Sequence, residues 1–291
     1  MKYIKNLHYY RYLYTKGTDE TFFPASKCQV LLLTVAFNNT EFVDLQISLL
    51  KKYFEDDFTH CVIDNSTQLS LRKEIKEVCL QHGVSYFGAP KSPFLDQKSH
   101  GAAMHWALYN VVRKSKPLFF GFLDHDIFPF KPFSLSGKFH QGIYGRVVNS
   151  YTKGGYLEER TKNAPYWSLW AGYCFFEYNR FKKMLPWDLN FLSKHFSGGY
   201  FLDTGGGLWD KIYSKTDYPG SLASYRQLRI DSLEGDGDQN QNFEIFDEAW
   251  IHFVSLSNWR EIKDLKEKKE KLTEILSKTK NEGVDFRSKI L

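Results

Sequence analysis

The most informative stretch of the sequence is Leu118-Phe119-Phe120-Gly121-Phe122-Leu123-Asp124-His125-Asp126. The apolar run before Asp124 is typical of a strand that is covered on both faces of a sheet. The run stops at two carboxylates, and the triplet Phe128-Pro129-Phe130 behind them argues against a free surface turn. We therefore expect Asp124 and Asp126 to lie at the exposed end of a buried strand. Carboxylate oxygens in this position suit a hard divalent cation, Mn²⁺ or Mg²⁺.

Upstream of this segment, strand-type and helix-type apolar patterns alternate. Apolar runs predict strands at 30–35, 60–63 and 84–87, and helical spacing of apolar residues predicts helices at 43–54, 71–78 and 104–111. This alternation indicates right-handed crossovers and an α/β fold, with a doubly wound, Rossmann-like, mostly parallel sheet flanked by helices. In such sheets, ligands bind beyond the carboxyl ends of the strands. One cleft can therefore contain the residues at those ends, namely Ala36, Phe37, Asn38, Asp64, Asp124 and His125.

The pattern downstream of Asp126 is looser. It predicts a strand at 170–176, a short helix at 181–185, a glycine-rich turn entering a helix at 201–209, a polar loop at 233–242 and a last strand at 250–253. Residues 260–280 have apolar side chains on roughly one face, which predicts an amphipathic C-terminal helix. We expect this helix to dock on the parent fold or on a partner rather than on a membrane, because acidic residues dilute its positive face.

The chain divides by composition into an arm, a domain and a tail. Residues 1–27 form the arm, whose first part is basic and rich in tyrosine; it can either pack on the domain or anchor at a membrane interface. The domain covers 28–255, with a nucleotide-binding half at 28–130 and an acceptor-binding half at 131–255. The C-terminal helical tail covers 256–291.

The composition limits the function. The chain has 291 residues, a formal net charge of +5, 25 Phe, 18 Tyr and 7 Trp. This length allows a sizeable core, and the mild charge without a basic motif favours a phosphate-bearing small molecule over nucleic acid as a partner. The spacing of the cysteines predicts reduced thiols. Without a signal peptide or a membrane-spanning stretch, we expect a cytoplasmic protein, with peripheral association at the inner face of a membrane as an open alternative.

These motifs together resemble the family 2 type of nucleotide-sugar glycosyltransferase with the GT-A fold, over roughly Val30 to Phe253. The first strand and its turn, here Ala36-Phe37-Asn38, touch the nucleotide in that family. Val62-Ile63-Asp64-Asn65-Ser66-Thr67 is similar to the second-strand motif, and the resemblance implies that Asp64 meets the edge of the base.

Two further stretches continue the resemblance. The stretch that begins at Gly101 resembles the helix start that approaches the donor phosphates, although His105 and Trp106 stand where the family often has Arg and Asn. Asp124-His125-Asp126 matches the metal motif. The resemblance implies that Asp126 binds the metal directly, and that Asp124 reaches the ribose or the metal shell. His252 either completes that shell or is a core histidine.

The resemblance also implies a catalytic base. The family's Glu-Asp pair is represented by Leu202-Asp203, so the glutamate is absent and Asp203 takes the role of base. The alternative is that Asp203 caps a helix beginning near Gly206. The acceptor-binding residues implied are Trp170, Gly172 and Thr204.

The function implied is metal-dependent transfer of a sugar from a nucleotide-sugar donor, a UDP-sugar being favoured, to a glycan or glycolipid acceptor. Inversion at the anomeric carbon is expected, and the setting is the synthesis of a surface polysaccharide or another glycan. Two alternatives stay open. One is a nucleotidyl- or phosphotransferase on a similar sheet, and the other is a non-catalytic, carbohydrate-binding descendant of the fold.

Overall fold

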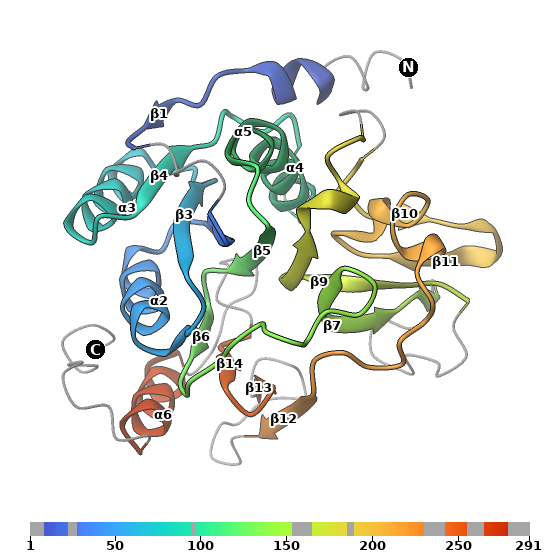
Figure 1. The fold of residues 1–291 in the computed structure, drawn as a ribbon. Helices are drawn as coiled ribbons and strands as arrows, with labels where there is room; N and C mark the ends of the chain where they lie inside the picture. Colours follow the sequence, from blue (N-terminus) through green and yellow to red (C-terminus); the bar gives the residue numbers. More distant parts are fainter. Residues whose placement is uncertain are drawn as a thin grey trace.

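The computed structural model describes residues 9–22, 28–94, 97–152, 165–184, 189–229, 242–254 and 265–278. In these residues the fold is mixed α/β, with a mostly parallel central sheet flanked by helices and two smaller sheets beside it (Figure 1). The predicted fold class is thereby confirmed. Within the described ranges, no helix combines the length and the apolar character that a membrane span requires.

The central sheet has seven strands in the order β1-β4-β3-β2-β5-β9-β7. They are β1 (Asp19–Glu20), β2 (Val30–Ala36), β3 (Phe58–Asp64), β4 (Ser85–Gly88), β5 (Phe119–Asp124), β7 (Ile143–Asn149) and β9 (Trp167–Glu177). Strands β4, β3, β2 and β5 are parallel, as the alternating pattern predicts, whereas β9 runs antiparallel to β5. The carboxyl ends of β2, β3 and β5 open at one edge, where Ala36 pairs with Asp64 and Val35 pairs with Asp124.

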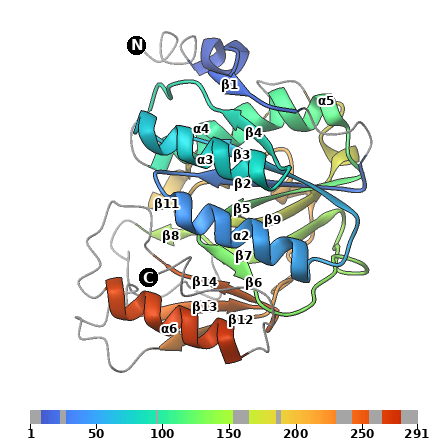
Figure 2. The same cartoon turned by 90° about the vertical axis from the view of Figure 1, so that its left-hand side faces the viewer.

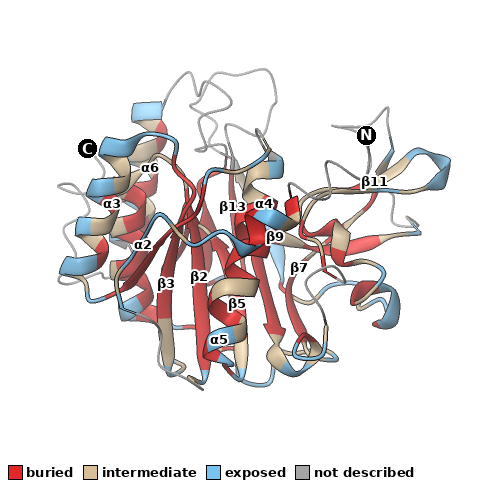
Figure 3. Ribbon diagram, turned by 90° about the horizontal axis from the view of Figure 1, so that it is seen from above, coloured by how far each residue is buried: buried red, intermediate tan, exposed pale blue. Residues whose placement is uncertain are grey.

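Helices cover both faces of this sheet (Figures 2 and 3). On one face lie α2 (Thr40–Tyr53) and α3 (Leu69–Gln81), and on the other lies α4 (Gln97–Ala107), which continues into α5 (Arg113–Ser115) through a wider turn at Leu108–Val112. Helix α2 begins where the side chain of Asn39 accepts a hydrogen bond from the backbone N–H of Phe42 at 2.8 Å. Strand β2 is buried along its whole length between these layers.

A second, antiparallel sheet lies beside α2. It has the order β12-β13-β14-β6 and comprises β12 (Tyr225–Arg229), β13 (Asn242–Phe246), β14 (Trp250–His252) and β6 (Ile127–Pro129). Helix α6 (Leu265–Lys278) packs on it, and its Leu272 and Leu276 are fully buried in a cluster with Phe42 and Phe253. The amphipathic helix therefore docks on the parent fold. Residues 256–264 and 279–291 of the predicted tail lie outside the described residues.

The described part of the N-terminal arm packs on α4. Tyr9, Tyr12 and Leu13 are buried in the core cluster that contains α4. The Tyr9 hydroxyl lies 2.5 Å from Nδ1 of His105, and the indole N–H of Trp106 donates to the Thr15 carbonyl at 2.9 Å. Of the two alternatives for the arm, packing on the domain is what residues 9–15 show.

The described parts of residues 131–255 depart from the prediction at several elements. Strand β7 is absent from the prediction because Gly145 and Arg146 interrupt its apolar pattern at a bulge. Residues 181–183 form a turn after the single 3-10 turn Tyr178–Arg180, and no helix forms there. The helix predicted after the glycine-rich turn is one 3-10 turn, Gly206–Leu208, because consecutive glycines are poor helix formers.

A third, small sheet lies in the same part of the chain. It has the order β10-β11-β8 and comprises β10 (Lys194–His195), β11 (Tyr200–Leu202) and β8 (Tyr151–Thr152). The polar loop predicted at 233–242 lies outside the described residues except for its last residue.

Candidate active site

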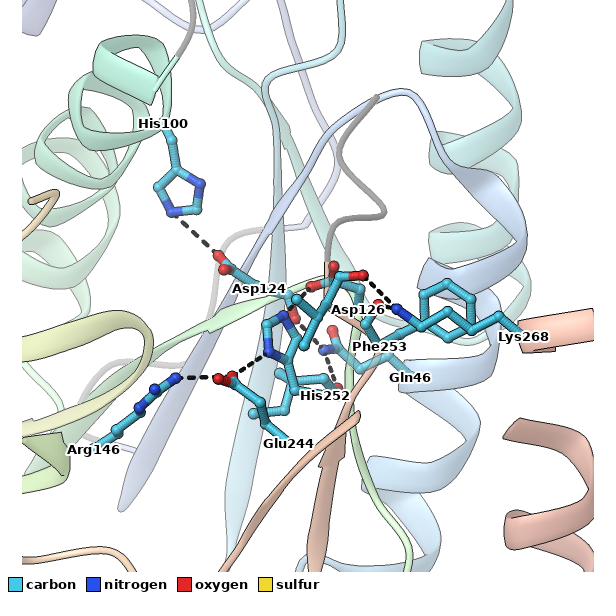
Figure 4. Close-up of polar contacts among 11 residues, drawn as sticks. Gln46, His100, Asp124, Asp126, Arg146, Glu244, His252, Phe253 and Lys268 are labelled. Atoms are coloured by element: carbon cyan, nitrogen blue, oxygen red, sulfur yellow. Dashed lines mark hydrogen bonds and ion pairs between the residues drawn. The ribbon is translucent and has the colours of Figure 1, made fainter. Parts of the chain in front are cut away.

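The site forms where the turn after β5 meets the end of β14 (Figure 4). β5 ends at Asp124 and β6 begins at Ile127, so the chain turns over His125 and Asp126. β6 pairs with β14, and this pairing places His252 opposite Ile127. One possible ligand atom from each of Asp124, Asp126 and His252 lies within 4.8 Å of the others. The structure brings together the three residues that were predicted to hold the metal.

A buried carboxylate holds His252 in one orientation. Its Nδ1–H donates to Oε2 of Glu244 at 2.8 Å, and its Nε2 lies 3.5 Å from Oδ1 of Asp126. Glu244 also accepts hydrogen bonds from Arg146 of β7 at 2.8 Å and from the Tyr225 hydroxyl at 3.0 Å. A histidine that ligates a metal almost always donates its other ring N–H in this way. The arrangement therefore presents the Nε2 of His252 to the aspartates.

Burial and charge act in opposite directions on the pKa values of these groups. Burial would lower the pKa of His252, but Asp126 and Glu244 outweigh it and raise this pKa to about 9. Burial would raise the pKa of Glu244, but Arg146 and His252 hold it at about 2. Burial would also raise the pKa of Asp126, but the same imidazole holds it well below its usual range. Without metal, His252 is therefore a cation between two carboxylates, and a divalent cation would replace its proton.

Asp124 is the most accessible member of the cluster. Its side chain is 23% exposed, whereas those of Asp126 and His252 are 3% and 8% exposed. The expectation of an exposed carboxylate is therefore wrong for Asp126, which His252 and the end of β14 cover. Burial raises the pKa of Asp124. Its Oδ1 makes no hydrogen bond with any described residue, although Nε2 of His100 in α4 lies 3.3 Å away.

This set of donors fits a divalent cation. Two carboxylates and a neutral imidazole are ligands that Mn²⁺ accepts, and Mg²⁺ takes the carboxylates with water and phosphate oxygens. The unbonded Oδ1 of Asp124 and the fixed Nε2 of His252 would both be satisfied by such an ion. The residues present therefore fit the metal that the motif implies.

Gly172 makes room for Asp124. A Cβ atom at Gly172 would lie 2.4 Å from Oδ2 of Asp124 and 2.5 Å from the ring of Trp170, so neither side chain could stay where it is. The Trp170 ring is half-buried, and its centroid lies 4.7 Å from that of the His252 ring. Trp170 and Gly172 were both predicted to bind the acceptor. In the structure, Trp170 packs against His252, and the missing side chain of Gly172 leaves the space that the Asp124 carboxylate occupies.

The polar side chains at the ends of β2 and β3 bond to each other. Asn38, at a positive φ of 47°, accepts from the backbone N–H of Thr67 and donates to its hydroxyl, at 3.0 Å each. Asp64 is fully buried, and its carboxylate accepts from the backbone N–H of Ser66 and from the Tyr86 hydroxyl, at 2.8 Å each. Asp64 thus fixes the turn after β3, and its carboxylate does not face solvent.

The other residues expected to contact the donor are mostly packing positions. Ala36 and His125 are buried, and Phe37 is partly exposed. Gly101 lets α4 approach the loop before β10, because a Cβ atom there would lie 2.7 Å from the carbonyl oxygen of Phe191. Of these residues, Phe37 is the one whose side chain has an accessible part.

Asp203 follows β11 and is partly exposed. Its Oδ1 accepts a hydrogen bond from the backbone N–H of the adjacent Thr204, which is also partly exposed, at 2.7 Å. The cap position of the following 3-10 turn is Gly205, so Asp203 does not cap a helix at Gly206. Between the described residues, no hydrogen bond or ion pair links Asp203 directly to the Asp124–Asp126–His252 cluster.

Several residues that shape the site were not predicted, namely Gln46, His100, Arg146, Glu244 and Lys268. Lys268 of α6 is fully buried and donates to the carbonyl oxygens of Phe253 and Val254, at 3.1 and 2.8 Å, which holds the chain directly after His252. Gln46 carried a signal in the sequence, because it is a polar residue on the apolar face of its helix. His100 and Lys268 stand beside polar residues and gave no signal. Arg146 and Glu244 interrupt apolar runs, as a solvent-facing strand residue also would, so they did not stand out.

No protein-family model and no curated protein matches the sequence. Solved structures that resemble the chain include a mannosyltransferase from Pyrobaculum calidifontis in complex with GDP-Man and Mn²⁺, at 10% identity and a TM-score of 0.35, over 62% of this chain and 53% of that chain. The mannosyltransferase Ktr4p from S. cerevisiae gives 10% identity and a TM-score of 0.35, over 62% of this chain and 66% of that chain. TarS from S. aureus gives 14% identity and a TM-score of 0.31, over 53% and 29%. The chain spans less than two thirds of each of these proteins, and similarity at this level does not identify a shared activity.

Proposed function

We propose that this protein is a metal-dependent glycosyltransferase that moves a sugar from a nucleotide-sugar donor to a glycan or glycolipid acceptor. The observation that carries the proposal is the cluster of Asp124, Asp126 and His252 at the carboxyl edge of the central sheet. In α/β sheets this edge is where ligands bind. A donor set of this kind is suited to a cation that also binds phosphate oxygens.

Each residue of the cluster has a distinct part in the proposed reaction. A bound Mn²⁺ or Mg²⁺ would stabilise the negative charge that develops on the leaving nucleoside diphosphate. The buried Asp126 and His252 would hold that cation, and Asp124, the most accessible of the three, would be the member nearest the donor. His100 lies beside Asp124 at the start of α4, where its imidazole is within reach of a diphosphate bound at the cluster.

On the acceptor side, we assign the role of general base to Asp203. The carboxylate is partly exposed, and the glycine-rich turn after it leaves space for an acceptor. A carboxylate in this role accepts the proton of the acceptor hydroxyl as it attacks the sugar, which gives inversion in a single displacement. Trp170 and Thr204 would contact the sugars, and a UDP-sugar is the donor that we favour.

Sugar transfer tests the proposal. Purified protein is screened by thermal shift with UDP-, GDP-, CMP- and dTDP-sugars, with and without Mn²⁺, because a ligand that binds the folded state raises the melting temperature. The donor that stabilises the protein is then assayed for release of its sugar. We expect one donor to give both a Mn²⁺-dependent shift and sugar release, and Asp126→Asn to abolish release.

The products separate the proposal from its alternatives. Release of pyrophosphate, or transfer of a nucleotidyl or phosphoryl group, would indicate a nucleotidyl- or phosphotransferase. Donor binding without any turnover would indicate a carbohydrate-binding descendant of the fold. Either result would contradict the assignment as a glycosyltransferase.

A further inference from the structure

One buried side chain spans the turn that carries the two aspartates. Gln46 of α2 is fully buried, and its amide nitrogen donates to the carbonyl oxygens of Asp124 and Ile127 at 2.7 Å each (Figure 4). These carbonyls lie on either side of the turn over His125 and Asp126. A glutamine amide has two N–H hydrogens, so Gln46 uses both of them to hold the two ends of the turn together.

The amide oxygen of Gln46 continues the network into the central sheet. Its Oε1 lies 2.5 Å from the hydroxyl of Thr34 in β2, and that hydroxyl lies 2.8 Å from Nε2 of His60 in β3. Because an amide oxygen only accepts, Thr34 donates to Gln46, and the Thr34 oxygen is left to accept from His60. Burial lowers the pKa of His60 to about 3, so the ring is neutral and carries its hydrogen on Nε2. The hydrogen bonds therefore run in one direction, from His60 to the turn.

Polar groups at these positions are not needed for packing. Gln46 lies between the buried Val43 and Leu50 on the apolar face of α2, where an apolar side chain would fill the same space. Burying an amide costs free energy unless its polar atoms are hydrogen-bonded, and here both the nitrogen and the oxygen of Gln46 have partners. The pairing of β5 with β9 ends at Leu123, and its pairing with β2 ends at Asp124. The turn thus lies beyond the sheet, and Gln46 supplies the donors that the sheet does not.

The turn is also held from the side of β14. The backbone N–H of Phe253 donates to the carbonyl oxygen of Asp126 at 2.9 Å, which ties Asp126 to the residue after His252. We infer that Gln46 is a positioning residue for the metal site: with Thr34 and His60, it fixes the turn so that Asp124 and Asp126 face His252 at the separation that a divalent cation needs. This inference rests on the proposed function only in taking the cluster as a cation site.

The test compares Mn²⁺ affinity among four variants, measured by electron paramagnetic resonance well below the melting temperature of each. Gln46→Met keeps the volume and removes both donors. Thr34→Val removes the hydroxyl that orients Gln46, whereas Thr34→Ser keeps it. Ile47→Val is the control, because it truncates a buried side chain next to Gln46 without touching the network.

We expect Gln46→Met to weaken Mn²⁺ binding by about 10–100-fold, the range typical of residues that orient metal ligands. Thr34→Val should weaken it less, and Thr34→Ser and Ile47→Val should bind as the wild type does. Wild-type affinity in Gln46→Met, or an equal loss in Ile47→Val, would overturn the inference. A wild-type protein that binds Mn²⁺ but transfers no sugar would contradict the proposed function alone, and one that binds no Mn²⁺ would contradict both.

Discussion

Raising the pH in the absence of metal should destabilise the protein through His252. Burial would lower the pKa of this residue, but Asp126 and Glu244 outweigh burial and raise it from 6.5 to about 9. A group that holds its proton more tightly in the folded state stabilises the fold while it is protonated. This contribution is complete below the unfolded pKa and is lost as the pH rises through the folded pKa. The gap between the two pKa values corresponds to roughly 3 kcal/mol of the free energy of unfolding.

The assay is urea unfolding in excess chelator at about pH 6 and about pH 10, with His252→Gln as the matched variant. Burial lowers the pKa of Lys268 to about 7, so this residue also titrates in the range, and its contribution has the opposite sign. Because Lys268 is present in both proteins, comparing the wild type with His252→Gln cancels its contribution. The wild type should lose about 3 kcal/mol more than His252→Gln between the two pH values.

Bound metal should reverse the pH dependence of the free energy of unfolding, because the cation and the proton compete for Nε2 of His252. Below pH 9, Mn²⁺ affinity should fall by up to about tenfold for each unit by which the pH is lowered. Calorimetry near neutral pH, in buffers of different ionisation enthalpy, should show about one proton released for each Mn²⁺ bound. Identical pH dependence of unfolding in the wild type and His252→Gln, or binding without proton release, would refute this reasoning.

Three substitutions test other parts of the site. Gly172→Ala should weaken Mn²⁺ binding about tenfold, because the new Cβ would lie 2.4 Å from Oδ2 of Asp124. Gly121→Ala is the control: its Cβ would meet the ring of Phe175 at 2.2 Å, so it should lower stability and leave Mn²⁺ affinity unchanged. Equal Mn²⁺ affinities in the two variants would contradict this prediction. Asp203→Asn should lower turnover by about 10²–10⁴-fold while donor binding persists, and either full turnover or a retained anomeric configuration, seen by NMR of the product, would remove Asp203 from the role of base. Asp64→Ala should lower the free energy of unfolding by about 1–3 kcal/mol, because it leaves the buried Tyr86 hydroxyl without its acceptor, and unchanged stability would show that this bond is dispensable.

Much of the parallel part of the central sheet could be predicted because its strands are buried on both faces. β2 and β5 are almost continuous apolar runs, and the helices between the strands repeat apolar residues at helical spacing. β7 could not be predicted in this way. Gly145 lies at a bulge with a positive φ of 143°, and Arg146 turns inward to Glu244, so neither an apolar run nor an alternation marks the strand.

Some residues of the candidate site could be predicted from the sequence, and others could not. Asp124 and Asp126 could be predicted because they are neighbours at the end of an apolar run, and His252 came from the resemblance to a known family. Glu244 and Arg146 are brought to His252 from two other strands, and nothing local in the sequence records that pairing. Tertiary hydrogen bonds of this kind depend on the fold that brings distant strands together, so they become visible only once that fold is known.

Phosphorus hyperfine coupling to protein-bound Mn²⁺ is the most direct measurement of whether Asp124, Asp126 and His252 hold a cation on a nucleoside diphosphate. Mn²⁺ is bound to the wild type and to Asp126→Asn, which keeps the buried volume, and UDP or GDP is then added. The wild type should bind one Mn²⁺ at the cluster and show phosphorus coupling when the diphosphate is present, and Asp126→Asn should lose both. Mn²⁺ binding that Asp126→Asn leaves unchanged, or a wild-type spectrum without phosphorus coupling, would contradict the proposed metal-dependent donor site.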